Sequence, residues 1–143
     1  QPSSGAKPGT AYMKYRGIEN FFGNCWNFTD GINSISRQVY VSNDDTDFAD
    51  DTTTNYDSLG DTVPTSNDYV VDVQNASGAF IPSSVTGGSS STCITDYFFQ
   101  NSENQVALFG GNADDGARAG AFAWILAGGS GNRRRNIGAR LAV

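Results

Sequence analysis

The stretch that decides the fold of this chain is GGNADDGARAGAFAWILAGGSGNRRRNIGARL, residues 110–141. Large apolar side chains at Phe122, Trp124 and Leu126 alternate there with mostly small residues. Period two is that of a β-strand, so we expect the large residues to face the core. The opposite parity then faces solvent or a ligand, and it comprises Ala121, Ala123, Ile125 and Ala127.

In two parts of this stretch, the residue types follow no pattern that a fold requires. Residues 112–118 and 133–135 mix Asn, Asp, Ala and Arg between the Gly, Ala and Phe positions of the framework. A framework with interchangeable surface positions suggests a binding face. Residues 136–143 repeat the alternation and predict a closing strand, which places Arg133-Arg134-Arg135 in the connection before it.

Outside this stretch, helical periodicity is weak, and short apolar runs are separated by Gly, Asn, Asp, Ser and Thr. This pattern favours a fold of strands and loops with little helix. Residues 18–22 before Gly23 could form one short helix. We expect strands at 26–29 and 38–41 to form a hairpin, and further strands at 69–73, 93–99 and 106–109, with residues 79–82 as a structural anchor.

Length and charge narrow the function classes. A chain of 143 residues with 38% hydrophobic residues can bury one core, so we expect one domain. No apolar run is long enough to span a membrane.

The net charge is −6, and basic residues are absent from 38 to 117, which argues against nucleic-acid binding. Residues 1–14 have the composition of a linker or an N-terminal extension.

Cysteine and acidic residues leave alternatives open. Cys25 and Cys93 could form one bridge or be two buried thiols. Residues 43–61 hold seven Asp among Thr and Asn, which is loop composition. A structural calcium site is the alternative to a solvated acidic loop, although the spacing lacks the Gly and the closing Glu of an EF-hand. No other cofactor is expected.

The chain contains no histidine, which removes the commonest general base and the commonest metal ligand. The glycine pairs match neither a phosphate loop nor a dinucleotide fingerprint. Arg133-Arg134-Arg135 could grip carboxylate or sulfate groups on a glycan or an acidic protein, or could be a solvated turn. We therefore expect a binding protein and not an enzyme.

The chain resembles the variable proteins of diversity-generating retroelements, which are related to the formylglycine-generating enzymes and sulfatase-modifying factors. The resemblance rests on Tyr15-Arg16-Gly17-Ile18-Glu19-Asn20, on Gly23-Asn24-Cys25-Trp26-Asn27-Phe28-Thr29-Asp30-Gly31 and on the framework of the 110–141 stretch. Gly23-Asn24-Cys25-Trp26-Asn27-Phe28 lacks the Glu that is typical of the related enzymes, and no cysteine follows Cys93. The missing Glu argues against a calcium site inherited from these relatives. The catalytic cysteines of formylglycine-generating enzymes lie near the carboxy end, so the absence of a cysteine after Cys93 indicates that oxidase activity is lost.

The resemblance implies an α+β, mostly β and loop architecture, namely a C-type lectin-like fold with a small twisted antiparallel sheet and little helix. The domain would span residues 15–143, with a variable region at about 110–141 and Trp124 as a scaffold residue. The ligand-binding, diversified positions would be Asn112, Ala113, Asp115, Ala117, Arg118, Ala123, Ile125, Ala127, Arg133, Arg134 and Arg135.

By the same resemblance, the domain would display a diversified surface to a host-cell ligand, as viral tail-fibre proteins and other adhesins do. The partner would be a host-cell surface protein or glycan, met on the virion surface or at the cell surface. Multiple copies would raise a modest affinity by avidity, so we expect a homo-oligomer in a larger assembly. The alternative is a virion structural or decoration protein with a fixed domain of the same fold.

Overall fold

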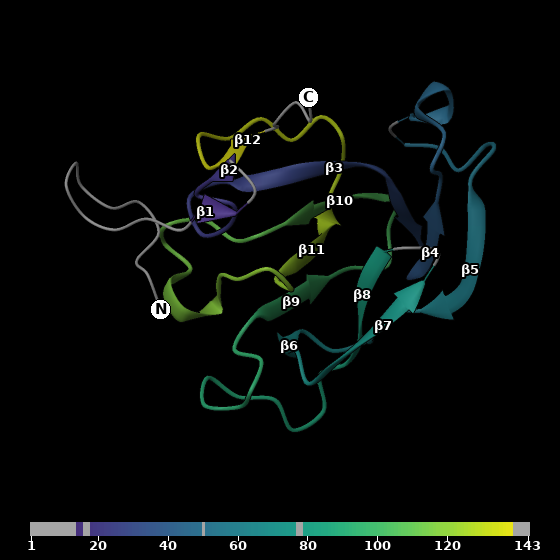
Figure 1. Cartoon of the computed structure of the whole chain (residues 1–143). Coiled ribbons are helices and arrows are strands. Elements are labelled where there is room, and N and C mark those ends of the chain that lie inside the picture. Colours follow the sequence, from purple (N-terminus) through teal and green to yellow (C-terminus); the bar gives the residue numbers. More distant parts are fainter. Residues whose placement is uncertain (1–13, 16–17, 50, 77–78, 139–143) are drawn as a thin grey trace.

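The computed structural model describes residues 14–15, 18–49, 51–76 and 79–138. Figure 1 shows a chain dominated by one sheet of eight strands. Along the sheet the order is β5 (Asp57–Thr62), β4 (Gln38–Val41), β3 (Trp26–Ile35), β10 (Gln105–Phe109), β11 (Trp124–Gly128), β9 (Tyr97–Gln100) and β6 (Asp68–Tyr69), and β12 (Ile137–Gly138) also pairs with β3.

Two smaller sheets and two short helical turns complete the described part. The small sheets are the pair β1 (Lys14–Tyr15) and β2 (Ile18–Glu19) and the pair β7 (Asp72–Ala76) and β8 (Ala79–Ser84). The helical turns are the 3-10 helices η1 (Asp45–Asp47) and η2 (Gly116–Arg118). The predicted mostly-β fold with little helix is thus confirmed. In the described residues, no helix is long and apolar enough to cross a membrane.

The sheet is mixed, whereas the resemblance implied a small antiparallel one. β10 is antiparallel to β3 and β11, but β11 is parallel to β9, and β12 is parallel to β3. The reason lies in the order of the strands. β9 and β10 are joined by the short connection of residues 101–104 and run in opposite directions, yet β11 lies between them. Because β11 is antiparallel to β10, it runs parallel to β9.

β3 and β4 form a hairpin, with Ile35 paired to Gln38, but through residues 32–35 of β3 and not through the predicted 26–29. Residues 27–29 pair with β10 instead, so the predicted pairing of 26–29 with 38–41 is wrong. The turn residues of the hairpin, Ser36 and Arg37, both have positive φ, as in the turns whose twist suits a two-residue hairpin. β3 is longer than predicted and runs through Asp30-Gly31. Because Val106 pairs with Asn33 but Ala107 pairs with Thr29, the strand bulges at these residues.

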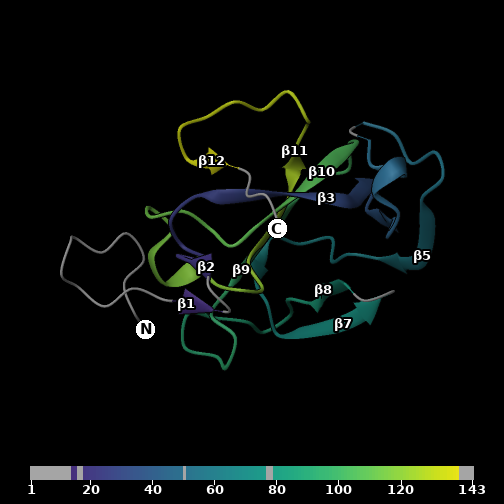
Figure 2. The ribbon, with the colours of Figure 1, turned by 45° about the horizontal axis from the view of Figure 1, so that its top comes forward.

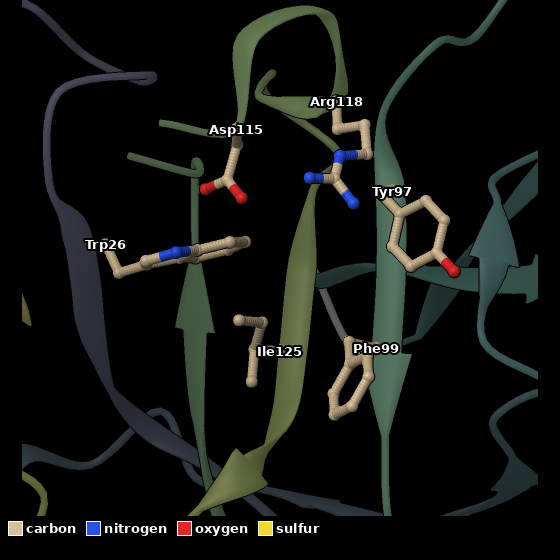
Figure 3. Close-up of a pocket in the computed structure, with 6 residues that line it drawn as sticks. All are labelled: Trp26, Tyr97, Phe99, Asp115, Arg118 and Ile125. Atoms are coloured by element: carbon tan, nitrogen blue, oxygen red, sulfur yellow. The ribbon is translucent and has the colours of Figure 1, made fainter. Parts of the chain in front are cut away.

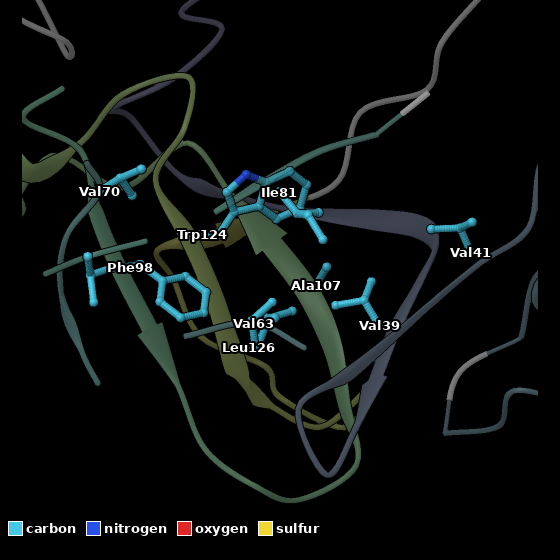
Figure 4. Packing of buried hydrophobic residues seen from close by; sticks show 10 residues of the cluster. Val39, Val41, Val63, Val70, Ile81, Phe98, Ala107, Trp124 and Leu126 are labelled. Atoms are coloured by element: carbon cyan, nitrogen blue, oxygen red, sulfur yellow. The ribbon is translucent and has the colours of Figure 1, made fainter. Parts of the chain in front are cut away.

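The two faces of the main sheet are set by the cross-strand register. Trp124 pairs with Phe109 and Phe98, so these three residues share one face. This face carries the larger core, in which β8 and the neighbouring loops cover the sheet (Figure 4). The buried members are Val39, Val41, Val63, Val70, Ile81, Val85, Phe98, Ala107, Trp124 and Leu126.

On the opposite face, Ile125 pairs with Leu108 and Phe99. A second, smaller core forms there around Trp26, Leu108 and Ala123, with Ile137 packed against it. Figure 2 shows the β7–β8 hairpin on one side of the main sheet and the loop leading to β12 on the other. The cover on this second face ends before β9, because Phe99 is 45% exposed.

Burial along β11 alternates as predicted. Trp124 and Leu126 are buried, and Ile125 and Ala127 are half-buried. The expectation that Trp124 is a scaffold residue agrees with this placement. Phe122 lies before the strand and is half-buried. Arg133, Arg134 and Arg135 lie in the connection before β12, as predicted, whereas residues 139–143 of the expected closing strand lie outside the described residues.

Several local predictions were wrong. Residues 18–22 form β2 and a bend instead of a helix, because Asn20 has a φ of 52°, which a helix does not admit. Residues 69–73 do not form one strand: Tyr69 ends β6 and Asp72 begins β7 in another sheet. Between them, the backbone of Val70 bonds to Asp96, whereas that of Val71 bonds to Ser84. Residues 57–61 lie in β5, not in a loop, because they pair with β4.

The cysteines are not bridged. Cys25 is half-buried and Cys93 is exposed, and both thiols are free. Of the two alternatives, unbridged thiols are confirmed, but burial is wrong for Cys93. That residue follows a turn segment of Ser and Thr whose side chains bond to the local backbone, and it is not part of β9.

The adjacent residues Phe98 and Phe99 test this assignment of the two faces. We expect Phe98→Ala to lower the free energy of unfolding by about 3–5 kcal/mol, because Phe98 is fully buried in the larger core. Phe99→Ala should cost about 1 kcal/mol or less, because its ring is 45% exposed. Urea denaturation of both variants measures the difference, and equal losses would contradict the register of β9.

Candidate functional site

The loop between β10 and β11 is tied down at both ends by backbone hydrogen bonds. Gly110 donates to the carbonyl of Ala123 (2.9 Å) and accepts from the amide of Gly23 (2.9 Å). Gly111 has a φ of 76°, and a Cβ there would lie 2.5 Å from the Cβ of Ala119. Both the positive φ and the close approach require glycine. The Gly110-Gly111 pair therefore sets the path of the loop.

Polar side chains inside the loop hold its shape. The carboxylate of Asp115 accepts from the amide of Asn112 (2.7 Å), and the side-chain oxygen of Asn112 accepts from the amide of Asp114 (2.7 Å). The loop then turns through η2 to Ala119. These bonds use the backbone and two side chains only, so Ala113, Ala117 and Arg118 are left exposed on a rigid frame.

A buried carboxylate supports the far end of the loop. Asp96 is 7% exposed and accepts a hydrogen bond from the amide of Phe122 (2.6 Å). It lies against Gly120, where any Cβ would overlap the carboxylate. Burial raises the pKa of Asp96 above its ordinary value of 3.8, and the bond from Phe122 opposes that shift. The carboxylate thus holds the entry to β11 at an electrostatic cost.

One side of this loop borders a pocket of about 110 Å³ on the less covered face of the sheet. Trp26, Tyr97, Phe99 and Ile125 form its apolar part (Figure 3). Asp115 and Arg118 lie together at one end, and Phe99 and Ile125 lie at the other. The guanidinium carbon of Arg118 is 5.6 Å from the ring centroid of Tyr97, within the range of a cation–π contact. We call this the aromatic pocket.

The other side of the loop borders a wider groove of about 440 Å³. Three chain segments contribute to it, and none of its lining residues in the described part of the chain is aromatic. The lining residues are Asn24, Cys25, Asn112, Ala113, Asp114, Arg134, Arg135 and Asn136. We call this the arginine groove. The loop of residues 112–118 therefore forms a wall shared by two concavities.

Most of the predicted ligand-binding positions come together around this loop. Asp115, Arg118 and Ile125 line the aromatic pocket, and Ala113, Arg134 and Arg135 line the arginine groove. Ala117 is exposed in η2, Arg133 is exposed beside the groove residues in sequence, and Ala127 is half-buried in β11. Segments that are separated by some twenty residues in the chain thus supply one continuous region.

Two predicted surface positions are instead buried. Ala123 is fully buried between Trp26 and Leu108 in the smaller core, because the chain enters β11 beneath the loop. Asn112 is 7% exposed, and its side chain serves the turn that holds Asp114. The outward parity predicted for β11 therefore begins at Ile125.

The sequence reasoning missed the aromatic walls and the support of this region. Tyr97 and Phe99 share the parity that faces the pocket, and the doublet Phe98-Phe99 is a signal for this, since one of two neighbouring strand residues must face away from the core. Asp96 stands inside an apolar run, which is a signal for a buried polar anchor. Trp26 was predicted to lie in a strand, but not to line a site.

The described residues of the acidic loop do not form a metal-binding cluster. In the described part of the chain, no group of three or more His, Cys, Asp or Glu side chains lies close enough together to hold a metal ion. Asp44 is used locally, because its carboxylate accepts from the hydroxyl (2.7 Å) and amide (3.0 Å) of Thr46. Those bonds lower the pKa of Asp44. The loop side chains bond to their own backbone, as its composition predicts.

Comparison with known proteins adds no relative. No protein-family model, no curated protein and no solved structure matches this chain. Function therefore has to be inferred from the two concavities and the loop between them.

The buried carboxylate gives a pH-dependent prediction. Because the pKa of Asp96 is raised in the folded state, its contribution to stability is present below the unfolded pKa and is lost as pH rises through the folded pKa. In Asp96→Asn this loss is absent. We therefore expect the stability of the variant, relative to the unchanged protein, to increase from pH 3.5 to pH 7, as measured by urea denaturation at both values. A relative decrease would mean that the bond to Phe122 outweighs burial.

Proposed function

We propose that this chain is a receptor-binding domain of the retroelement variable-protein type, which presents a diversified surface to a ligand on a host cell. The observation that carries the proposal is the aromatic pocket. Its lining combines exposed or partly exposed aromatic side chains with Arg118 and Asp115 at one end. Few polar groups on an apolar, concave surface are typical of ligand-binding sites.

The exposure of Phe99 supports a binding role. Its ring is 45% exposed on a strand that is paired on both sides, and it lies in the lining of a pocket together with Trp26 and Tyr97. Tyr, Trp and Arg are the residue types that contribute most to binding energy at interfaces, and Tyr97, Trp26 and Arg118 line the same pocket as Phe99. A ligand group that covered this ring would gain apolar burial.

In the loop, the residues that hold the backbone differ from those whose side chains are exposed, and this separation supports diversification. Its backbone is held by Gly110, Gly111, Asn112 and Asp96, whereas the side chains of Ala113, Ala117 and Arg118 make no hydrogen bond within the described structure. Such side chains can be replaced with little effect on stability. The same holds for Arg133, Arg134 and Arg135 in the connection to β12, so the fold tolerates a changing surface there.

Under this proposal the domain binds and does not catalyse, and it acts at the surface of a virion, as in a tail fibre, or at a cell surface. A single shallow site gives modest affinity, so several copies in one assembly would act together. The alternative of a fixed decoration protein requires a broad apolar face for packing against neighbours. Among the described residues, the large exposed apolar side chains are Phe48, Val71, Phe80 and Phe99, which lie on separate elements.

The pocket can be tested with an array. A labelled tetramer of the domain is applied to arrays of bacterial surface glycans and envelope proteins. For a ligand found there, we expect Phe99→Ser and Arg118→Ala each to weaken binding by about tenfold or more, as for hot-spot residues. Phe80→Ser is the matched control, because Phe80 is 52% exposed on β8, away from the pocket. Unchanged affinity in the first two variants would contradict the proposal.

Diversification is tested separately, by sequencing the encoding locus across a population. We expect a reverse-transcriptase gene and a near-copy of the segment for residues 110–141. Differences should be concentrated at the exposed positions 113, 117–118 and 133–135. Position 123 should keep a small residue, because the Ala123 side chain is fully buried and a larger one would overpack the smaller core. A uniform segment without a template copy would refute diversification, while leaving the pocket to be judged by the array.

A further inference from the structure

The arginine groove has a chemistry different from that of the aromatic pocket. Arg134 and Arg135 are both exposed, and neither forms an ion pair with any carboxylate among the described residues. In a chain with a net charge of −6, two arginines that line one groove and have no ion-pair partner among the described residues are a local reversal of charge. Guanidinium groups bind carboxylate, sulfate and phosphate oxygens in a bidentate manner.

Residues 24–26 connect the backbone next to these arginines to the backbone of the loop on the other side of the groove. The amide of Trp26 donates to the carbonyl of Asn136 (2.8 Å), and the amide of Ala113 donates to the carbonyl of Asn24 (3.2 Å). Asn24 also forms a β-bridge with Asn112. The segment of residues 24–26 therefore bonds to both neighbouring segments and forms the floor between two walls.

The two walls differ in charge. One wall carries Arg134 and Arg135, and the other carries the exposed Asp114, whose backbone amide is bonded but whose carboxylate makes no hydrogen bond in the described structure. The side chains of Asn24 and Asn136 add groups that both donate and accept hydrogen bonds. A matching ligand has an anionic group at one side and hydroxyl donors at the other.

We infer that the arginine groove binds an acidic carbohydrate, whose sulfate or carboxylate lies against Arg134 and Arg135 and whose hydroxyl groups donate to Asp114. This inference deepens the proposed function and rests on it, since it names a ligand class for part of the same variable region. The groove volume of about 440 Å³ lies within the range of small-ligand sites. A densely acidic peptide fits less well, because Asp114 repels its charges and it has few hydroxyl donors.

Three polymers with one glucan backbone test the inference: dextran, dextran sulfate and carboxymethyl dextran, the last two lightly substituted so that most hydroxyl groups stay free to donate to Asp114. The full chain should bind at least one of the charged polymers and not neutral dextran, in interferometry at 0.15 M salt. The double variant Arg134→Gln/Arg135→Gln should weaken this binding by roughly tenfold or more, because two charge-assisted contacts are lost. Arg133→Gln is the matched control. The substitution removes one positive charge from the same connection, but Arg133 is not among the residues that line the groove.

Asp114→Ala gives the sharpest result. If Asp114 accepts hydroxyl groups, its removal should weaken binding of the charged dextran. If the binding were only attraction between opposite charges, the same change would strengthen it, because a negative charge is removed. Thermal unfolding of each variant checks that the fold is intact, and the bond from the Asp114 amide to Asn112 does not depend on the replaced side chain.

Four outcomes would overturn the inference: no binding of either charged polymer, an equal loss in Arg133→Gln, stronger binding by Asp114→Ala, or tighter binding of poly-L-glutamate than of the charged dextrans. Phe99→Ser separates this failure from failure of the proposed function. The variant should bind the charged dextran normally, because Phe99 lies in the aromatic pocket and not in the groove. If the unchanged protein bound no charged dextran but still bound an array ligand in a manner that depends on Phe99, the groove inference would be refuted and the proposed function would stand.

Discussion

The position of β11 between β9 and β10 is the constraint on which the rest of the structure depends. Because β11 is paired on both sides, its alternation is transmitted across the sheet: Trp124 aligns with Phe98 and Phe109 in the larger core, and Ile125 aligns with Leu108 and Phe99 on the other face. A shift of one residue would exchange these two sets and expose the core. The same strand therefore determines both what is buried and which side chains reach the aromatic pocket.

The chain reaches this position through a loop whose backbone is fixed and whose surface is not. Glycine at positions 110 and 111 allows the turn, Asn112 and Asp115 close it, and the buried Asp96 holds the amide of Phe122 where the strand begins. A buried carboxylate that binds a backbone amide costs desolvation but specifies one conformation. Stability is thus concentrated in a few residues, and the neighbouring exposed side chains carry little of it.

The loop of residues 112–118 separates two concavities of different chemistry. The aromatic pocket offers apolar burial with one guanidinium and one carboxylate, and the arginine groove offers opposite charges across a floor of carboxamides. A ligand large enough to span the wall would contact both, and binding through two weak sites joined in one molecule is stronger than binding through either. Replacing the exposed side chains of this wall would alter both concavities at once, which is the property that a diversified binding surface needs.

The sequence by itself determined the mostly-β class, the strand at residues 38–41, the two faces of β11 from Trp124 onward and the placement of Arg133, Arg134 and Arg135 in a connection, because these follow from local periodicity and turn composition. Only the tertiary structure decided that the sheet is mixed, that residues 27–29 pair with β10 and not with β4, that Ala123 and Asn112 are buried, and that Trp26, Phe99 and Arg118 line one pocket. Those facts depend on which strand lies beside which, and pairing between distant segments leaves no trace in local periodicity. A small residue such as Ala123 fits a surface or a core equally well until its neighbours are known.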